Sequence, residues 1–241
     1  MKNDRREVHM LVFNCGSSSL TFKVFAASSE ADARPVLSGK AHRVGVKGSQ
    51  PSFLEFHFGE KNERVEVPLE SHDQAAALVL SKLRRWGVPV DCIGHRWGHG
   101  GGCFQTAWVD KALLGKLRAL VPMMPIHHPA MLRVILQCRR SLPQVPQFVT
   151  TDGAFHATIP SHAYTYPLPK EIIRRFGFRK FGFHGLSYKY VVRTAAAHAG
   201  LALGDSRIIA CHLGTGGRAP WQSLTARPST LPWGILGSRG W

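Results

Sequence analysis

Four turns rich in glycine, histidine or hydroxyl residues constrain the fold most, because each follows a run of residues typical of a buried strand. Their sequences are NCGSSS (14–19), HRWGHGGG (95–102), FHGLS (183–187) and HLGTG (212–216). Glycine permits positive φ and a close approach of the backbone to a ligand, and successive N–H groups in such turns bind anions. Any one of them alone is most simply a tight turn, and none has the Gly-Lys-Ser/Thr of a Walker A loop. Together they favour a cleft at strand ends that binds phosphate groups.

The order of the predicted elements indicates an α/β fold built as two lobes. Apolar runs predict strands at 8–13, 20–25, 53–58, 64–69, 147–152 and 207–212, and a strand that begins at 92 and breaks into the glycine loop. Helical periodicity predicts helices at 71–87, 110–120, 129–142, 170–177 and 186–200. Because strands come first and then alternate with helices, we expect one lobe at 1–150 and the beginning of a second at 151–216.

The chain is strongly basic, with a formal net charge of +16 from 31 Lys and Arg against 15 Asp and Glu. Such an excess points first to polyanionic partners. The basic residues are spread along the chain without interleaved aromatic residues, so we expect no specific nucleic-acid binding. No apolar run approaches the roughly 20 residues of a membrane span, and MKNDRREVHM does not resemble a secretory leader. With five scattered cysteines and no CxxC spacing, we expect a cytoplasmic protein without a membrane partner.

Polar residues on or beside the glycine turns supply candidate catalytic groups. Asp152 ends a predicted strand, Arg96 follows His95 in the second turn, and His184 directly precedes Gly185. Simpler explanations remain open: an Asx turn or cap for the aspartate and a structural ion pair for the arginine, while one histidine among 13 is weak evidence by itself. As a set with an asparagine, they suit phosphoryl transfer, which needs mainly positioned charge around an in-line phosphate.

These segments also resemble a known family. LVFNCGSSSL, IGHRWGHGG, PIHHPA, TTDGAFHATIP, FGFHGLSYKYV and IIACHLGTG occur in the order and spacing of the signature segments of the acetokinase family, from about residue 10 to residue 216. The resemblance implies an ASKHA (actin-like, ribonuclease H-like) fold whose two lobes close on a nucleotide, and a homodimer. It implies transfer of the γ-phosphoryl group of ATP to acetate, giving acetyl phosphate and ADP, with Mg²⁺ as cofactor.

The resemblance further implies roles for individual residues. Asp152 would be the catalytic aspartate, and His184 the histidine that stabilises the transferring phosphoryl group. Arg96 would bind the substrate carboxylate, and Asn14 would be associated with the metal. The small acyl pocket would include Ile126 and Phe183, and the ATP-binding residues would be Thr21, His212, Leu213, Gly214, Thr215 and Gly216.

Several positions depart from the family pattern. Thr21 stands where the family has a nucleotide-contacting lysine, and Lys23, two residues along the strand, is not a simple replacement. Gly98 replaces an apolar pocket residue, which leaves a propionate or butyrate kinase as an alternative. The other departures are Leu186, Tyr188 and Thr215.

The segment from Arg218 to Trp241 has no periodicity and contains three Pro and three Trp. When this segment is back-translated into codons and read in a shifted frame, the possible codons permit the continuation that is typical of the family. We therefore interpret the segment as a frameshifted tail. We expect residues 217–241 to be disordered and unable to join the strand at 207–212.

The family places its adenine site, a transition-state arginine and much of its dimer contact further along, so we expect this chain alone to be inactive and its homodimer to be in doubt. A non-catalytic fragment that binds anions or a partner is the alternative from another class.

Overall fold

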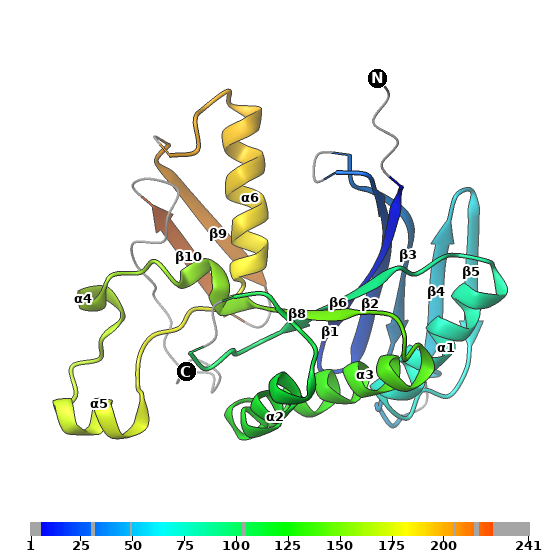
Figure 1. Cartoon of the computed structure of the whole chain (residues 1–241), viewed down its shortest axis with the longest axis horizontal. Helices are drawn as coiled ribbons and strands as arrows, with labels where there is room; N and C mark the ends of the chain where they lie inside the picture. Colours follow the sequence, from blue (N-terminus) through cyan, green and yellow to red (C-terminus); the bar gives the residue numbers. More distant parts are fainter. Residues whose placement is uncertain are drawn as a thin grey trace. The chain divides into compact units, whose positions relative to one another are not determined.

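The computed structural model describes residues 6–29, 32–48, 50–102, 105–204, 206–214 and 217–223 (Figure 1). The chain divides into two compact units, Met1–Trp97 with Thr106–Thr150 (unit 1), and Gly98–Gln105 with Thr151–Trp241 (unit 2). The loop at 98–105, predicted as part of the first lobe, belongs to unit 2. Helices and strands are mixed along the chain, as the predicted α/β class requires.

An eight-stranded sheet forms the centre of unit 1, with the strand order β5-β4-β3-β2-β1-β6-β8-β7. Its first five strands are antiparallel neighbours, and β6 pairs in parallel with β1 after a helical crossover. β7 pairs antiparallel with β8 at the far edge. The bounds are β1 (Val8–Cys15), β2 (Ser19–Ala27), β3 (Arg34–His42), β4 (Phe53–Phe58), β5 (Lys61–Glu66), β6 (Cys92–Trp97), β7 (Ala107–Trp108) and β8 (Gln147–Thr151).

The predicted hairpin of unit 1 is confirmed, with a shift in its second strand. β4 matches the predicted 53–58, but β5 occupies Lys61–Glu66 instead of 64–69. The reason is the turn, which contains only Gly59 and Glu60, so that Phe58 pairs directly with Lys61. Gly59 has a φ of 58°, a left-handed conformation that glycine adopts without a steric penalty.

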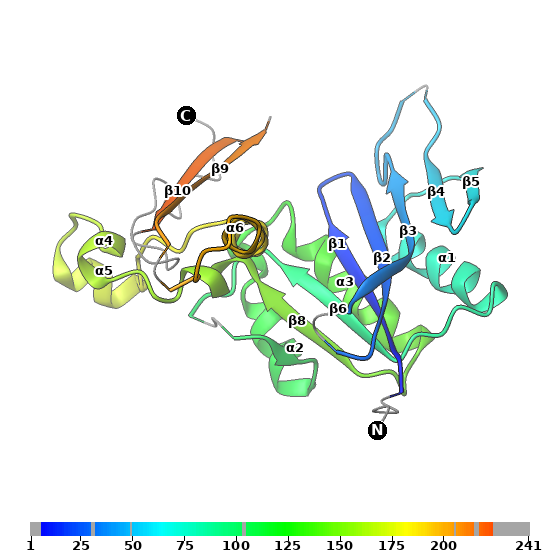
Figure 2. The ribbon, with the colours of Figure 1, turned by 90° about the horizontal axis from the view of Figure 1, so that it is seen from above.

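The two faces of this sheet differ sharply in burial. Along β1, β2 and β4 every second side chain is buried, and the buried set includes Leu11, Phe13, Leu20, Phe22, Leu54 and Phe56. Helices α1 (His72–Arg85) and α3 (His128–Ser141) pack against each other and cover these residues (Figures 1 and 2). The alternate residues of the same strands are polar or partly exposed, and we call their side of the sheet the open face. Unit 1 also contains α2 (Lys111–Ala119) and η1 (Val121–Met123).

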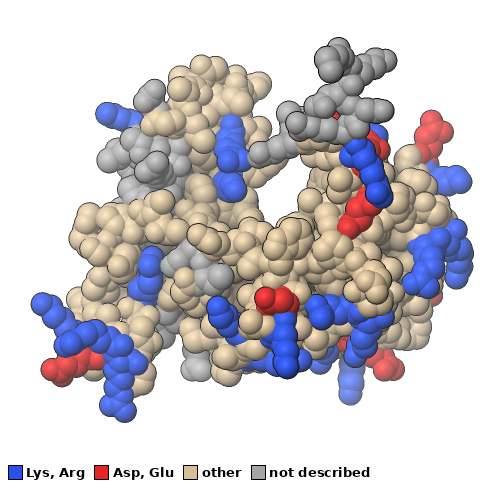
Figure 3. All heavy atoms as spheres, in the orientation of Figure 1, with Lys and Arg blue, Asp and Glu red and all other residues tan. Residues whose placement is uncertain are grey.

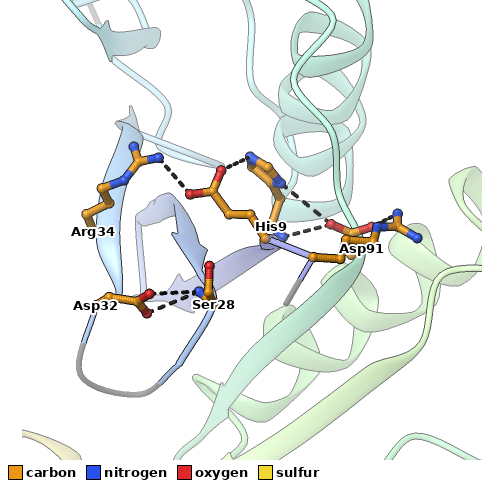
Figure 4. A network of polar contacts seen from close by, with 7 residues as sticks. His9, Ser28, Asp32, Arg34 and Asp91 are labelled. Carbon is orange, nitrogen blue, oxygen red and sulfur yellow. Dashed lines mark hydrogen bonds and ion pairs between the residues drawn. The ribbon is translucent and has the colours of Figure 1, made fainter. Parts of the chain in front are cut away.

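A polar network joins the amino ends of β1 and β6 (Figure 4). The backbone N–H of His9 donates to Asp91 Oδ2 at 2.8 Å, and the N–H of Asp91 donates to the His9 carbonyl at 2.8 Å. The His9 ring lies between this carboxylate and that of Glu7, which Arg34 of β3 contacts at 2.7 Å. The network therefore ties three strands together at the end of the sheet opposite to Asn14 and Arg96, and it helps to set their register.

Unit 2 is built around one long helix. α6 (Gly185–His198) packs on η2 (Asp152–His156) and on β9 (Ile208–Gly214), and its buried residues Tyr188 and Val192 form a small core with Ala210. The remaining elements are α4 (Ser161–Tyr164), α5 (Lys170–Phe176) and β10 (Gly217–Ser223).

The prediction that the chain after Gly216 cannot join the preceding strand is wrong for residues 217–223. These residues form β10, which pairs antiparallel with β9 from Gly217 opposite Gly214 to Ser223 opposite Ile208. The two strands make a sheet of their own, so β10 is an edge strand, and an edge strand tolerates a proline such as Pro220 because its missing N–H can lie on the unpaired side. Residues 224–241 lie outside the described part of the chain.

The Lys and Arg side chains form several separate groups on the face shown in Figure 3, with acidic residues among them. This distribution agrees with the dispersed pattern seen in the sequence. Within the described ranges, no helix is both long enough and apolar enough to cross a membrane.

Candidate active site

Each unit carries one group of candidate residues. In unit 1, Asn14 and Arg96 lie next to each other near the carboxyl ends of the parallel strands β1 and β6, where Phe13 pairs with His95. Arg96 Nη1 donates a hydrogen bond to Asn14 Oδ1 at 3.1 Å. A guanidinium group presents its donors in a planar fork that suits two-point binding of a carboxylate. The pair thus provides an oriented cation at the end of the sheet.

Buried neutral groups surround the turn that follows Asn14. Burial raises the pKa of the Cys15 thiol to about 12, although the charges of Arg133 and Arg96 act in the opposite direction. The His72 Nε2 is 2.9 Å from the Gly16 carbonyl, which can only accept, so this nitrogen carries the proton. Burial lowers the pKa of His72, so the histidine is neutral at pH 7. The Cys15 thiol and the His72 imidazole are therefore both neutral at pH 7, so neither adds to nor offsets the positive charge of Arg96.

His127 is a further residue beside Arg96, and the sequence interpretation gave it no role. Burial lowers its pKa, and the positive charge of Arg96 lowers it further. A neutral imidazole in this position can donate a hydrogen bond to a carboxylate without adding a second full charge. Its place in the segment PIHHPA was the available signal.

Two other predicted residues of unit 1 lie in different surroundings. Thr21 is the cross-strand partner of Asn14, so the two side chains share the open face. The Ile126 side chain is 71% exposed in the segment between η1 and α3. At this exposure, the described residues do not enclose Ile126 in an apolar pocket.

In unit 2, Asp152 is the first residue of η2 and only 1% exposed. The start of α6 approaches it very closely, because a Cβ built on Gly185 would lie 1.9 Å from the Asp152 carbonyl oxygen and 3.0 Å from Phe155 Cβ. Only glycine fits this contact. The glycine of the predicted FHGLS turn thus brings the amino end of α6 against the aspartate.

His184 directly precedes α6 in a left-handed conformation, with φ 57° and ψ 18°. This conformation costs a residue other than glycine roughly 1 kcal/mol or more. Its ring stacks on His212 of β9, with centroids 4.0 Å apart and planes inclined by 7°. Tyr188 packs edge-on against His212 and hydrogen-bonds to its backbone. The two predicted histidines are therefore brought together on one side of α6.

His156 is a second residue for which the sequence interpretation gave no role, although it lies four positions after Asp152. Its Nε2 is 3.0 Å from the carbonyl oxygen of Phe183, so this nitrogen donates. Burial lowers the pKa of His156, the hydrogen bond to Phe183 and the Asp152 carboxylate act in the opposite direction, and the nearby His184 lowers the pKa further. A neutral His156 thus connects η2 to the strained residue before α6.

The other predicted residues of unit 2 are described only in part. The Phe183 ring is 6.4 Å from the ring of His99, which also packs edge-on against Phe181. Leu213 and Gly214 lie in β9, opposite Arg218 and Gly217. Thr215 and Gly216 lie outside the described residues.

The substitution His156→Ala is expected to lower the free energy of unfolding by about 2–4 kcal/mol, because it opens a cavity and leaves the Phe183 carbonyl without its donor. His156→Gln, whose amide can donate from a similar distance, should cost clearly less. Urea unfolding followed by circular dichroism measures both values. Equal losses in the two variants would show that packing, and not the hydrogen bond, is what His156 provides.

Comparison with known proteins identifies the family of this chain. A sequence profile of the Acetokinase family matches residues 9–220. The chain belongs to the acetokinase family. The acetate kinase of Heliobacterium modesticaldum is 40% identical over 215 residues, which are 86% of this chain and 53% of that protein. The acetate kinase of Pseudomonas aeruginosa is 39% identical over 210 residues, 86% and 52% of the two chains.

Solved structures of acetokinases have the same fold. The crystal structure of acetate kinase from Entamoeba histolytica aligns with a TM-score of 0.79 and 36% identity, covering 94% of this chain and 55% of that one. A propionate kinase from Francisella tularensis aligns with a TM-score of 0.84 and 26% identity, covering 95% and 58%. The ASKHA fold and the family predicted from the sequence are thereby confirmed. This acetokinase chain spans about half the length of the curated relatives it matches.

Proposed function

We propose that this chain supplies part of an acetate kinase-type phosphotransferase, which moves the γ-phosphoryl group of ATP to acetate and forms acetyl phosphate and ADP. The observation that carries the proposal is the Arg96–Asn14 pair at the carboxyl ends of β1 and β6. A planar cation there suits a small carboxylate. The names of the relatives support acetate as that carboxylate.

The proposed reaction needs no general base. A carboxylic acid is already ionised at pH 7, so an acetate oxygen attacks the γ-phosphorus directly, and the bond to the bridging oxygen breaks to release ADP. Arg96 orients the acceptor, and His184 with His212 donates hydrogen bonds to the oxygens of the phosphoryl group in transfer. Because no proton has to be removed, the buried Asp152 is proposed to act through its negative charge and not as a general base. Phe183 gives the acyl group an apolar neighbour.

Mg²⁺ fits the oxygen donors of this site. Among the described residues, no three or more His, Cys, Asp or Glu side chains gather as a metal site. Mg²⁺ at a nucleotide takes only one or two protein ligands together with phosphates and waters. The amide oxygen of Asn14 in unit 1 and the carboxylate of Asp152 in unit 2 are each a ligand of the kind it prefers, and either would hold it. When bound, the ion neutralises charge on the phosphates.

Propionate is a second candidate acceptor. The propionate kinase from Francisella tularensis aligns with 95% of this chain. Gly98 has no side chain that would limit the length of the acyl group. The proposal further implies a cytoplasmic location, because the reaction uses the ATP of the cell.

The 241-residue chain alone is proposed to bind the two anionic substrates without turning them over, since it spans only about half of its relatives. Loss of a single arginine that stabilises the transition state commonly costs about 10³-fold or more in phosphoryl transfer. ATP consumption with acetate should therefore stay at background, and the family homodimer is not assigned to this chain.

Acetate binding tests the role of Arg96. Arg96→Leu is expected to weaken acetate binding by about 10- to 100-fold, the effect of losing hydrogen bonds to a charged group, and Arg96→Lys should retain part of the affinity. Titration of the chain with isotope-labelled acetate, followed by NMR, gives the dissociation constants. Arg140→Leu, an exposed residue at the end of α3, is the matched control. Unchanged affinity in Arg96→Leu would contradict the proposed function.

A further inference from the structure

We propose that Lys40 and Lys23 form a polyphosphate-binding subsite on the open face, beside Asn14 and Thr21. The inference rests on the proposed function, because it assigns these residues to the phosphates of the donor nucleotide. Lys40 had no role in the sequence analysis, and Lys23 was named there only as no simple replacement for the lysine that the family has at the position of Thr21.

The strand register places the two lysines next to the candidate carboxylate site. Asn14 of β1 lies opposite Thr21 of β2, and Thr21 lies opposite Lys40 of β3. Directly opposed residues of an antiparallel pair share one face, with Cβ atoms roughly 4.5–5.5 Å apart. Asn14, Thr21 and Lys40 therefore form one row across three strands.

Lys23 extends this row into a patch. It lies two residues from Thr21 on the same strand and faces Ser38 of β3, so its side chain is also on the open face. Lys23 and Lys40 are diagonal neighbours, roughly 7–8 Å apart, which is within reach of long side chains. Both side chains are exposed, and their flexible stems let the two ammonium groups converge on one anion.

The patch combines two lysines with one neighbouring carboxylate, that of Glu55. Glu55 of β4 lies opposite Lys40, but its carboxylate Oε2 is 2.9 Å from His42 Nε2. Elsewhere in unit 1, Lys82 has its own carboxylate partner, Glu63. Among the described residues, neither Lys23 nor Lys40 forms an ion pair with a carboxylate, and Arg96 lies at the end of the same row. Cations held side by side in this way repel one another, and a multiply charged anion removes that cost.

The chemistry of the patch favours phosphate over a second carboxylate. An ammonium group is a compact charge with three donors that can follow the tetrahedral oxygens of a phosphate chain. The Thr21 hydroxyl adds a neutral donor between the lysines and Asn14. A carboxylate at Arg96 and a polyphosphate along Thr21 and Lys40 would then lie beside each other on one sheet, which is the relation that acceptor and donor require.

The test uses inorganic tripolyphosphate, a probe that needs no adenine site, with the 241-residue chain in isothermal titration calorimetry. Lys40→Thr is expected to weaken binding by about tenfold at low salt. The exchanged double variant, Thr21→Lys with Lys40→Thr, returns an ammonium group to the same face and should restore the affinity to within about threefold. Lys61→Thr, in the edge strand β5, is the matched control and should change the affinity less than twofold. Circular dichroism confirms that each variant is folded.

The outcomes separate this inference from the proposed function. If Lys40→Thr changes the tripolyphosphate affinity no more than Lys61→Thr does, while acetate binding still depends on Arg96, the subsite is wrong and the proposed function stands. If Lys40→Thr weakens binding but the double variant does not recover it, the placement beside Thr21 is wrong. If the unaltered chain binds neither tripolyphosphate nor acetate, both the subsite and the proposed function fail.

Discussion

Replacing Gly185 by alanine is expected to be among the most damaging single changes in unit 2. The added Cβ would lie 1.9 Å from the Asp152 carbonyl oxygen, a backbone atom that cannot turn away as a flexible side chain would. Either α6 or η2 must move, and overpacking of this kind costs about 1–3 kcal/mol or more. The movement would also displace His184, which precedes the glycine in its left-handed conformation. We therefore expect both lower stability and at least tenfold weaker phosphate binding.

Gly204→Ala is the control for this variant, because a Cβ at Gly204 meets no atom within 4 Å in the same unit. Urea unfolding and titration with inorganic phosphate should be measured for both. If the two alanine variants have the same stability and the same phosphate affinity, α6 does not depend on the close contact with Asp152.

Acidification is expected to destabilise unit 1 through His95. This side chain is fully buried and its Nε2 lies 2.8 Å from Gln147 Oε1, and burial lowers its pKa from 6.5 to about 4. His95 is therefore protonated below about pH 6.5 in the unfolded chain, but only below about pH 4 in the folded chain. The free energy of unfolding keeps its full value above pH 6.5 and decreases as the pH falls from 6.5 towards 4. Between pH 7 and pH 5 the loss from this group is about 2 kcal/mol.

His95→Gln should be less stable than the original chain at pH 7 but should lose less stability on acidification. Tryptophan fluorescence during urea unfolding at pH 7, 6 and 5 measures the difference, and His57→Gln, an exposed change, controls for removal of a histidine. Parallel pH profiles for the original chain and His95→Gln would contradict the assignment to His95.

Local patterns predicted much of the sheet but not all of it. The alternation in 20–25 and 53–58 identified β2 and β4, because one face of these strands is buried. β3 was missed, since Pro35, Gly39 and Lys40 interrupt its pattern. It forms because β2 and β4 flank it, and Gly39 is needed where a Cβ would lie 2.2 Å from the Glu55 carbonyl and 2.3 Å from the Phe22 ring. Both of these contacts come from neighbouring strands.

The candidate-site residues that lie on turns could be predicted from the sequence. Those placed by strand pairing or by long-range contacts could not. Asn14, Arg96, Asp152 and His184 each lie on or beside a glycine-containing turn, which is a local signal. The contact of His156 with Phe183 joins residues 27 positions apart, and the position of Lys40 depends on strand register. Neither relation can be read from local spacing. The pairing of β10 was predicted wrongly because its sequence lacks a strand pattern.

The position of β6 beside β1 also has a consequence for the order of folding. The first five strands pair with their immediate neighbours, so this meander can form from local contacts alone. The contact between Arg96 and Asn14 joins residues 82 positions apart, and it requires closure of a long loop that includes α1. Because long-range pairings form slowly, a chain emerging during synthesis is expected to form its meander before the Arg96–Asn14 contact. Under the proposed function, binding of acetate would then report that β6 has joined the meander.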